Sequence, residues 1–476
     1  MKRVILLLCL LSGLGAAGKE SGGGAGAKVD PRVELLGIVF RLAGAPEYSS
    51  TYAKQYVEDI EAWFAPYRED TLVRYVKRIR SQYYVGYDAV ARLAVHLEGR
   101  GGQYRLPEEV HASLVSYGQW SVEGALEFVG LLNEFYKKSH FNRFFKRHRA
   151  WYGKMEERFD RQVGFDRGWY TSFYGEKGES DYRIVIGCGN GSANYGISVV
   201  RDGGEKTAYS IMGCRVFDRE GLADFSRGRP ASILIHEFNH SFVNPLMFLD
   251  GNRERLKAAG EKIIAVLKDE LSAQGYPDWE PMFNEAVVRA AVVRYMRDMG
   301  FSAQEIENEI RTQRNQHFLW TASLDSLLGE YSRQRDRYPT LRSFYPRIIE
   351  FFDRVAENIE EMKAQHLSHC PQVAALSPFE NGAQGVDPGL TEMVVVFDLP
   401  LTEDLFAVVP DEQGGEFPAA QVMGFVGDDR KAVRIGLRLE PGKQYGMRLE
   451  TPRLKTSTEQ GYMLQPYSVQ FSTTAH

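Results

Sequence analysis

The residues best suited to chemistry lie in one apolar run, from Pro230 to Pro245. His236 and His240 are four residues apart, so on a helix their imidazoles project from one face, one turn apart. Two imidazoles at this spacing can bind one Zn²⁺, and Glu237 is placed to act as a general base on the water that such an ion binds. Pro230 suits a first helical turn and Pro245 ends a helix, which predicts about four turns between them.

A chance occurrence of the pattern is the alternative interpretation. With ten His in the chain, His-Glu-x-x-His is expected about 0.01 to 0.02 times at this length. A helix that is apolar on most faces is buried, and buried imidazoles and carboxylates carry a large desolvation cost unless a metal or a partner satisfies them. The neighbours of the motif make this helix apolar on most faces: Ile233, Leu234, Ile235, Phe238, Phe242 and Val243. The run therefore predicts a metal site.

A catalytic zinc usually has three protein ligands and one open position. No His follows His240 closely, because the next one is His317. A carboxylate from a second helix is the other solution, and Glu285 is the best candidate. The alternative is an exposed ion pair between Glu285 and Arg289, four residues apart on one helix. The choice of Glu285 rests on the apolar stripe that it opens, which continues through Val288, Val292, Tyr295 and Met299.

This ligand set predicts hydrolysis. Zinc lowers the pKa of its water toward about 7, so that Glu237 can accept the proton while hydroxide attacks a polarised carbonyl. Glu237 then passes the proton to the leaving nitrogen. The developing oxyanion needs a side-chain donor in addition to the metal. The downstream candidates for that donor are Tyr295, His317 and Tyr331.

The composition is that of a large globular protein. A chain of 476 residues that is 43% hydrophobic predicts two or three domains with ample core. Lys and Arg number 58 against 63 Asp and Glu, and the net charge of −5 argues against a nucleic-acid partner. Four cysteines are too few for a disulfide-stapled scaffold. No apolar segment is long enough to span a bilayer, so we expect no transmembrane segment.

The N-terminus predicts export. Residues 1–17 have a basic start, a short apolar run and small residues at the end, which is the layout of a cleaved signal peptide. A buried first helix or strand is the alternative. Cys9 follows three leucines rather than small residues, so we do not expect a lipoprotein anchor. Residues 18–32 are expected to form a flexible linker, and the mature protein to be secreted or periplasmic. Cys188 and Cys214 are a possible disulfide, whose connectivity the sequence leaves open.

The pattern along the chain changes three times. Helical spacing dominates residues 52–159 and returns at 230–363, while short strands are expected at 182–186 and 196–200. After residue 370 the chain turns to strand-like runs between turn signals. These runs lie at 393–397, 421–425, 432–439 and 445–449.

The motif with Glu285 resembles the gluzincin metallopeptidases, whose third zinc ligand is a Glu on a following helix. The resemblance implies a zincin-like domain with His236, His240 and Glu285 as ligands and Glu237 as general base. Two features depart from the common pattern. The spacing from His240 to Glu285 is 45 positions, longer than usual, and Arg289 stands where an acid usually follows. The aminopeptidase signature Gly-x-Met-x-Asn is absent, which favours an endopeptidase.

Two further resemblances extend this interpretation. The run HEFNHSFVNP, within residues 33–365, resembles a bacterial family of unknown function thought to contain secreted metallopeptidases. Residues 377–401 and 439–450 resemble bacterial Ig-like modules, which implies a β-sandwich that contacts a surface, a glycan or a protein. In gluzincins a strand before the zinc helix pairs with the substrate backbone. That implies substrate-binding residues at Asn194, Tyr195 and Gly196.

We therefore predict an α+β protein with two domains. A mainly helical zincin-like metallopeptidase domain with a small mixed sheet would span residues 33–370, and an all-β Ig-like sandwich residues 375–476. The predicted function is that of a secreted peptidase with one catalytic Zn²⁺, of the endopeptidase type, acting on a peptide or protein substrate. The alternatives are a zinc hydrolase of a non-peptide amide and a catalytically inactive, zinc-containing scaffold or adhesion protein.

Overall fold

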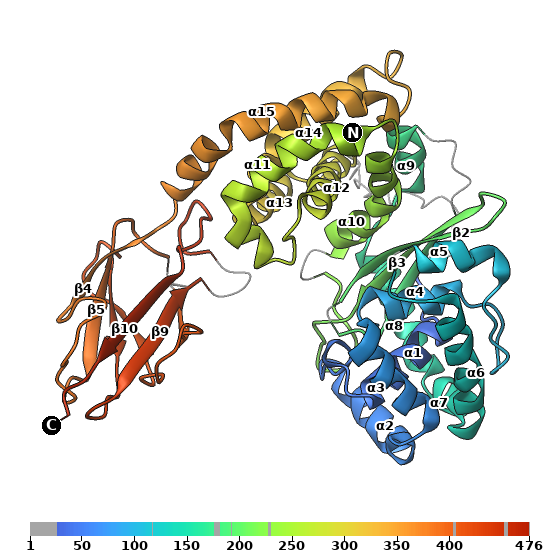
Figure 1. The fold of residues 1–476 in the computed structure, drawn as a ribbon, viewed down its shortest axis with the longest axis horizontal. Helices are drawn as coiled ribbons and strands as arrows, with labels where there is room; N and C mark the ends of the chain where they lie inside the picture. Colours follow the sequence, from blue (N-terminus) through green and yellow to red (C-terminus); the bar gives the residue numbers. More distant parts are fainter. Residues whose placement is uncertain are drawn as a thin grey trace, which may run out of the picture. The chain divides into compact units, whose positions relative to one another are not determined.

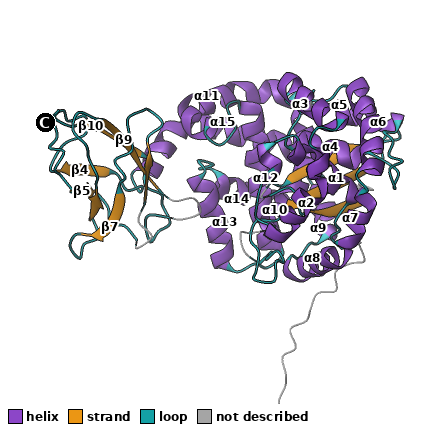
Figure 2. Cartoon of the chain, turned by 90° about the horizontal axis from the view of Figure 1, so that it is seen from below, coloured by secondary structure: helices purple, strands orange, loops and turns teal. Residues whose placement is uncertain are grey.

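The computed structural model describes residues 26–116, 118–175, 181–191, 193–226, 230–402, 406–451 and 456–475. The predicted signal peptide and residues 18–25 of the predicted linker lie outside the described residues. The rest of that segment is described: Lys28 pairs with Val185, and α1 begins at Pro31. The chain divides into two compact units, residues 1–241 and 242–476. Helices and several small sheets make it an α+β protein, as predicted (Figures 1 and 2).

Helices make up most of the first unit. Several begin at an acidic or hydroxyl residue whose side chain accepts a backbone N–H, as Asp30, Asp70 and Ser121 do. The helical stretch expected from residue 52 onward is interrupted at Pro66, where a 3₁₀ turn separates two helices. The helices are α1 (Pro31–Leu42), α2 (Lys54–Phe64), α3 (Thr71–Tyr83), α4 (Asp88–His96), α5 (His111–Val115), α6 (Val122–Lys138), α7 (Phe141–Arg147), α8 (Arg149–Gln162) and α9 (Arg167–Tyr174).

A small mixed sheet follows these helices, as predicted. Its strands are β1 (Asp181–Gly187), β2 (Tyr195–Val200) and β3 (Lys206–Gly213), in the order β1-β3-β2. β3 is parallel to β1 and antiparallel to β2. The sequence did not predict β3, because this central strand is buried continuously from residue 208 to 212 and lacks apolar–polar alternation. β2 and β3 lie between α10 (Pro230–Val243) and α4 and α5 in Figure 1.

A buried carboxylate joins α1 to the end of β1. Glu34 accepts hydrogen bonds from the Tyr56 hydroxyl and from the backbone N–H of Cys188, both at 2.7 Å. The Tyr56 hydroxyl also lies 2.8 Å from that of Tyr152 on α8. Burial raises the pKa of Glu34 to about 7, against the opposing effect of these hydrogen bonds.

Helices also form the first half of the second unit. α12 is buried on nearly all faces from residue 282 to 296, and α11 packs against α15. No helix among the described residues meets the length and apolarity that crossing a membrane requires. The helices are α11 (Asn252–Ser272), α12 (Trp279–Asp298), α13 (Ala303–Asn315), α14 (Thr321–Arg333) and α15 (Leu341–Leu367).

Two antiparallel sheets follow α15, in the orders β4-β5-β8-β7 and β10-β9-β6 (Figure 2). Their inward side chains share one apolar core, to which Val395, Val433, Met447 and Val469 contribute. The predicted runs coincide with β5, β7, β8 and β9. The strands are β4 (Val373–Ser377), β5 (Glu392–Phe397), β6 (Ala407–Pro410), β7 (Gln421–Phe425), β8 (Ala432–Gly436), β9 (Gln444–Glu450) and β10 (Tyr467–Ser472).

Glu34→Gln should change how stability depends on pH. Between the ordinary carboxyl pKa of 4.5 and the folded value of about 7, the folded chain keeps a proton that the unfolded chain loses. The free energy of unfolding of the wild type therefore falls as pH rises through this window, by at most about 1.4 kcal/mol per pH unit. In the variant, the amide oxygen can still accept the backbone N–H of Cys188, and the amide NH2 can donate to the Tyr56 hydroxyl. The amide does not titrate, so the slope disappears. The midpoints of guanidinium-induced unfolding, measured between pH 4.5 and 8, show how stability depends on pH in each protein.

The control is Glu58→Gln, because Glu58 is exposed on α2. If the free energy of unfolding depends on pH in the same way in E34Q, E58Q and the wild type, the raised pKa of Glu34 is contradicted.

Candidate metal centre

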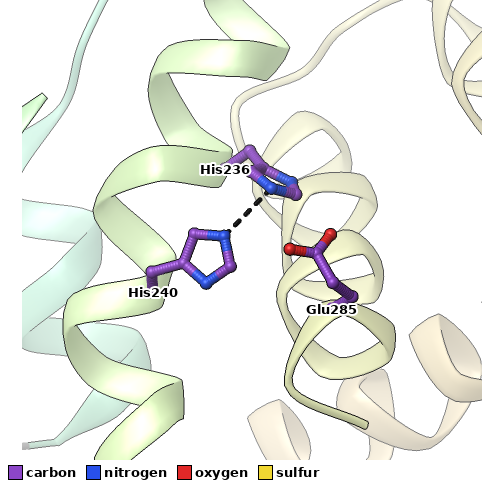
Figure 3. A group of neighbouring side chains, drawn as sticks. All are labelled: His236, His240 and Glu285. Atoms are coloured by element: carbon purple, nitrogen blue, oxygen red, sulfur yellow. Dashed lines mark hydrogen bonds between the residues drawn. The ribbon is translucent and has the colours of Figure 1, made fainter. Parts of the chain in front are cut away.

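The predicted motif helix is present as α10, which runs from Pro230 to Val243. Its two histidines project from one face, and their Nε2 atoms lie 3.1 Å apart (Figure 3). Two nitrogen ligands on a tetrahedral zinc, with bonds of 2.0–2.1 Å, would be separated by about 3.3 Å. The spacing of His236 and His240 therefore fits a shared ion.

Glu285 on α12 and the histidine pair form a group of three side chains that could hold a metal ion, called the ligand group below. One ligand atom from each of His236, His240 and Glu285 lies within 4.8 Å of the other two (Figure 3). Both imidazoles are half-buried, and Glu285 is 8% exposed. No other set of three His, Cys, Asp or Glu residues in the described part of the chain is grouped in this way. Two imidazoles and one carboxylate are a donor set that catalytic zinc accepts.

Two tyrosines of α9 bind α10 next to its histidines. Tyr170 donates to the backbone oxygen of Ile235 at 3.2 Å, one residue before His236. Tyr174 donates to the side-chain oxygen of Asn239 at 3.0 Å, one residue before His240, and Asn239 is fully buried. These bonds fix the rotation of the helix about its axis. The face that carries the histidines is therefore set by residues outside the ligand group.

β2 lies directly against the backbone of α10. A Cβ at position 196 would come within 2.2 Å of the backbone oxygen of Glu237, so only glycine permits this approach. Close by, the Ser198 hydroxyl donates to the Ser241 hydroxyl at 2.9 Å. The strand therefore supports the helix at the residue predicted to act as general base.

The predicted substrate strand is an edge strand of the described sheet, since there β2 pairs with β3 on one side only. The side-chain oxygen of Asn194 accepts the backbone N–H of Gly213 at 3.0 Å. The ring of Tyr195 is buried, and Gly196 is packed against the helix. These three residues thus have structural contacts of their own, and their role in binding a substrate stays a prediction.

The far end of this edge is already covered. The Ser113 hydroxyl of α5 donates to the backbone oxygen of Ser198 at 3.3 Å and accepts the backbone N–H of Val200 at 3.2 Å. An added strand cannot pair with those two groups while Ser113 holds them. Pairing with a substrate would be limited to the start of β2.

Glu285 and Arg289 form the ion pair that was the alternative interpretation, with Nε and Oε2 2.9 Å apart. The pair is not on a solvated face, because each residue is only 8% exposed. Arg289 also donates to the side-chain oxygens of Gln313 and Gln316, and its guanidinium lies 4.2 Å from the centre of the Phe318 ring. This network orients the Glu285 carboxylate. This network was not predicted from the sequence, although an arginine on an otherwise apolar helix indicates that it has polar partners.

The three predicted oxyanion donors are not members of the ligand group. Tyr295 follows Glu285 by ten residues on α12, which is about 15 Å along the helix axis. Tyr331 is fully buried on α14. The ring centre of His317 lies 5.5 Å from that of His366, and burial lowers the pKa of His317. Their catalytic role stays a prediction.

Residues 27–351 match the model of a family described as a domain of unknown function, DUF4932. The chain belongs to this family. The match includes α10 and α12, and hence all three residues of the ligand group. The description of the DUF4932 family names no activity. No curated protein matches the chain.

Solved structures of the bacterial surface-layer protein SbsC show some likeness. Domains 1–6 of that protein are 14% identical with a TM-score of 0.16, covering 53% of this chain and 34% of the other. The crystal structure of the S-layer protein rSbsC is 10% identical, with a TM-score of 0.16 and coverages of 83% and 45%. The N-terminal part of SbsC is 11% identical, with a TM-score of 0.15 and coverages of 83% and 78%. The chain thus spans about a third of the first of these. TM-scores this low do not establish a shared fold.

Glu285→Gln should weaken zinc binding by tenfold or more, because an amide oxygen lacks the charge of the carboxylate. Competition with a chromophoric chelator measures the affinity. Glu280→Gln is the matched control, since Glu280 lies on the same helix and pairs with Arg253 at 2.5 Å. Equal zinc affinities for E285Q and E280Q would contradict the role of Glu285 as a ligand.

Gly196→Ala should destabilise the fold by about 1–3 kcal/mol and weaken zinc binding, because the methyl group forces β2 and α10 apart. Thermal midpoint and zinc content per chain are the readouts. Gly203→Ala serves as control, because a Cβ there meets no atom within 4 Å. If both variants behave like the wild type, the close packing of β2 on α10 does not exist in solution.

Proposed function

We propose that this protein is a zinc-dependent peptidase of the gluzincin type, with a zincin-like catalytic region. The observation that carries the proposal is the ligand group of His236, His240 and Glu285, together with Glu237 on the same helix. A structural zinc site requires four ligands and no base, whereas a catalytic site keeps three ligands and a base beside them. Three ligands and a neighbouring glutamate correspond to the second arrangement.

Each residue of the proposed site would have its own role in hydrolysis. His236, His240 and Glu285 would hold the ion, and Arg289 would keep the Glu285 carboxylate in place through its 2.9 Å contact. Bound Zn²⁺ supplies Lewis-acid polarisation of the scissile carbonyl and lowers the pKa of water toward about 7. Glu237 would accept the proton of the attacking water on its carboxylate and deliver it to the leaving nitrogen.

The substrate is proposed to be a peptide or an unfolded protein segment. An extended backbone could add to the start of β2, because among the described residues β2 lies at the edge of its sheet. The engagement of Ser198 and Val200 by Ser113 leaves only a short stretch for such pairing. That observation favours a second candidate, a zinc hydrolase that acts on a small, non-peptide amide.

The proposal extends to the location and to the C-terminal strands. We propose that the protein is secreted or periplasmic, on the basis of the signal-like residues 1–17. The two sheets after α15 would form an Ig-like module that contacts a surface, a glycan or a protein.

Glu237→Gln separates an enzyme from an inactive scaffold. The variant should keep one zinc per chain and lose at least about a hundredfold in the rate of substrate hydrolysis, because a general base commonly contributes that much or more. Zinc content and hydrolysis of both an unfolded protein and a set of simple acyl amides are measured for wild type, E237Q and the E280Q control.

Cleavage of the unfolded protein by wild type and E280Q, but not by E237Q, supports the peptidase. Hydrolysis of the acyl amides alone supports the second candidate. Zinc in all three proteins, with no hydrolysis of either substrate by wild type, contradicts the enzymatic proposal and favours the scaffold.

A further inference from the structure

Two cysteines follow directly after paired strands of the first unit. β1 and β3 are parallel neighbours, and their last residues, Gly187 and Gly213, are partners in the register. Cys188 directly follows Gly187, and Cys214 directly follows Gly213. Neighbouring strands lie about 4.8 Å apart. That spacing falls within the range of about 4.4–6.8 Å between Cα atoms that a disulfide requires.

Both cysteines are buried, and their thiols are free in the structure. Cys188 is 3% exposed and Cys214 is 1% exposed. Burial, together with the neighbouring Cys214 thiol, raises the pKa of Cys188 well above its ordinary value. In the first unit the described residues include no third cysteine.

We infer that Cys188 and Cys214 are the site of an intramolecular disulfide, formed when the chain folds in the presence of a disulfide oxidant. The thiolate of one cysteine attacks a sulfur of the oxidant and expels one oxidant thiol, which leaves a mixed disulfide. The thiolate of the second cysteine attacks its partner's sulfur and expels the other oxidant thiol. Two protons leave the cysteines, the cysteines are oxidised, and the oxidant is reduced to two thiols.

The burial of the pair sets the time at which this bond forms. A thiol must ionise to react, and neither thiol is accessible once the fold is complete. Exchange must therefore occur before α1 packs against this end of the sheet, where Glu34 accepts the backbone N–H of Cys188. Once formed, the bond resists reduction for the same reason.

The disulfide would link the end of β3, the central strand, covalently to the end of β1. β3 pairs with β1 on one side and with β2 on the other, and β2 is the strand that packs against α10 at Glu237. Cys370 has a polar neighbour of its own. It lies in the second unit, where its Sγ is 3.6 Å from His366 Nε2.

Peptide mapping of the full chain tests the inference without reference to zinc or activity. The protein is refolded in a buffer of reduced and oxidised glutathione, alkylated in guanidinium, and digested without reduction. We expect the peptides that contain Cys188 and Cys214 to appear as one linked species that separates on reduction, while Cys370 is alkylated throughout. Reductant added to the unfolding assay should lower the thermal midpoint by about 5 °C or more.

Variants sharpen the test. In Cys188→Ala the Cys214 peptide should become alkylated, and in Cys370→Ala the link should persist. The reductant should leave the thermal midpoint of C188A unchanged. Full alkylation of both cysteines in the refolded wild type, or a link between either of them and Cys370, would overturn the inference, whether or not the variants fold.

Discussion

The cost of burying polar groups on α10 is the constraint on which the site depends. Leu234, Ile235, Phe238 and Val243 are buried and hold the helix in the protein. The same helix carries two imidazoles and a carboxylate, which lose hydration when the apolar residues pack. A metal ion would compensate the imidazoles directly. The half-buried side chains of His236, Glu237 and His240 therefore lose part of their hydration, and an ion or other polar partners would offset that cost.

Neighbouring residues hold α10 in position and orient Glu285, the proposed third ligand. α9 holds its rotation through Tyr170 and Tyr174, and β2 supports its backbone at Gly196. Glu285 is oriented by Arg289, which is itself held by amide side chains and an aromatic ring. None of these supporting residues needs to touch a substrate. They keep the ligand atoms in positions that an ion can bridge, which is what makes a site effective.

The sequence predicts those parts of the structure that depend on local interactions, and it misses those that depend on distant partners. α10 and its histidine pair were predictable, because a spacing of four residues on a helix is a local property. The β-rich end was predictable from short strand-like runs between turn signals. β3 was not, because a central strand that is buried on both faces has no alternation. The burial of Arg289 was equally hidden, since its partners Gln313 and Gln316 lie 24 and 27 residues downstream.

The central claim is that His236, His240 and Glu285 bind one zinc ion. A crystal structure of the zinc-loaded protein, with anomalous diffraction measured on both sides of the zinc edge, tests it most directly. The account predicts a single anomalous peak within about 2.0–2.2 Å of both histidine Nε2 atoms and one Glu285 carboxylate oxygen. A zinc peak elsewhere, or full zinc loading with no peak between these three residues, would contradict it.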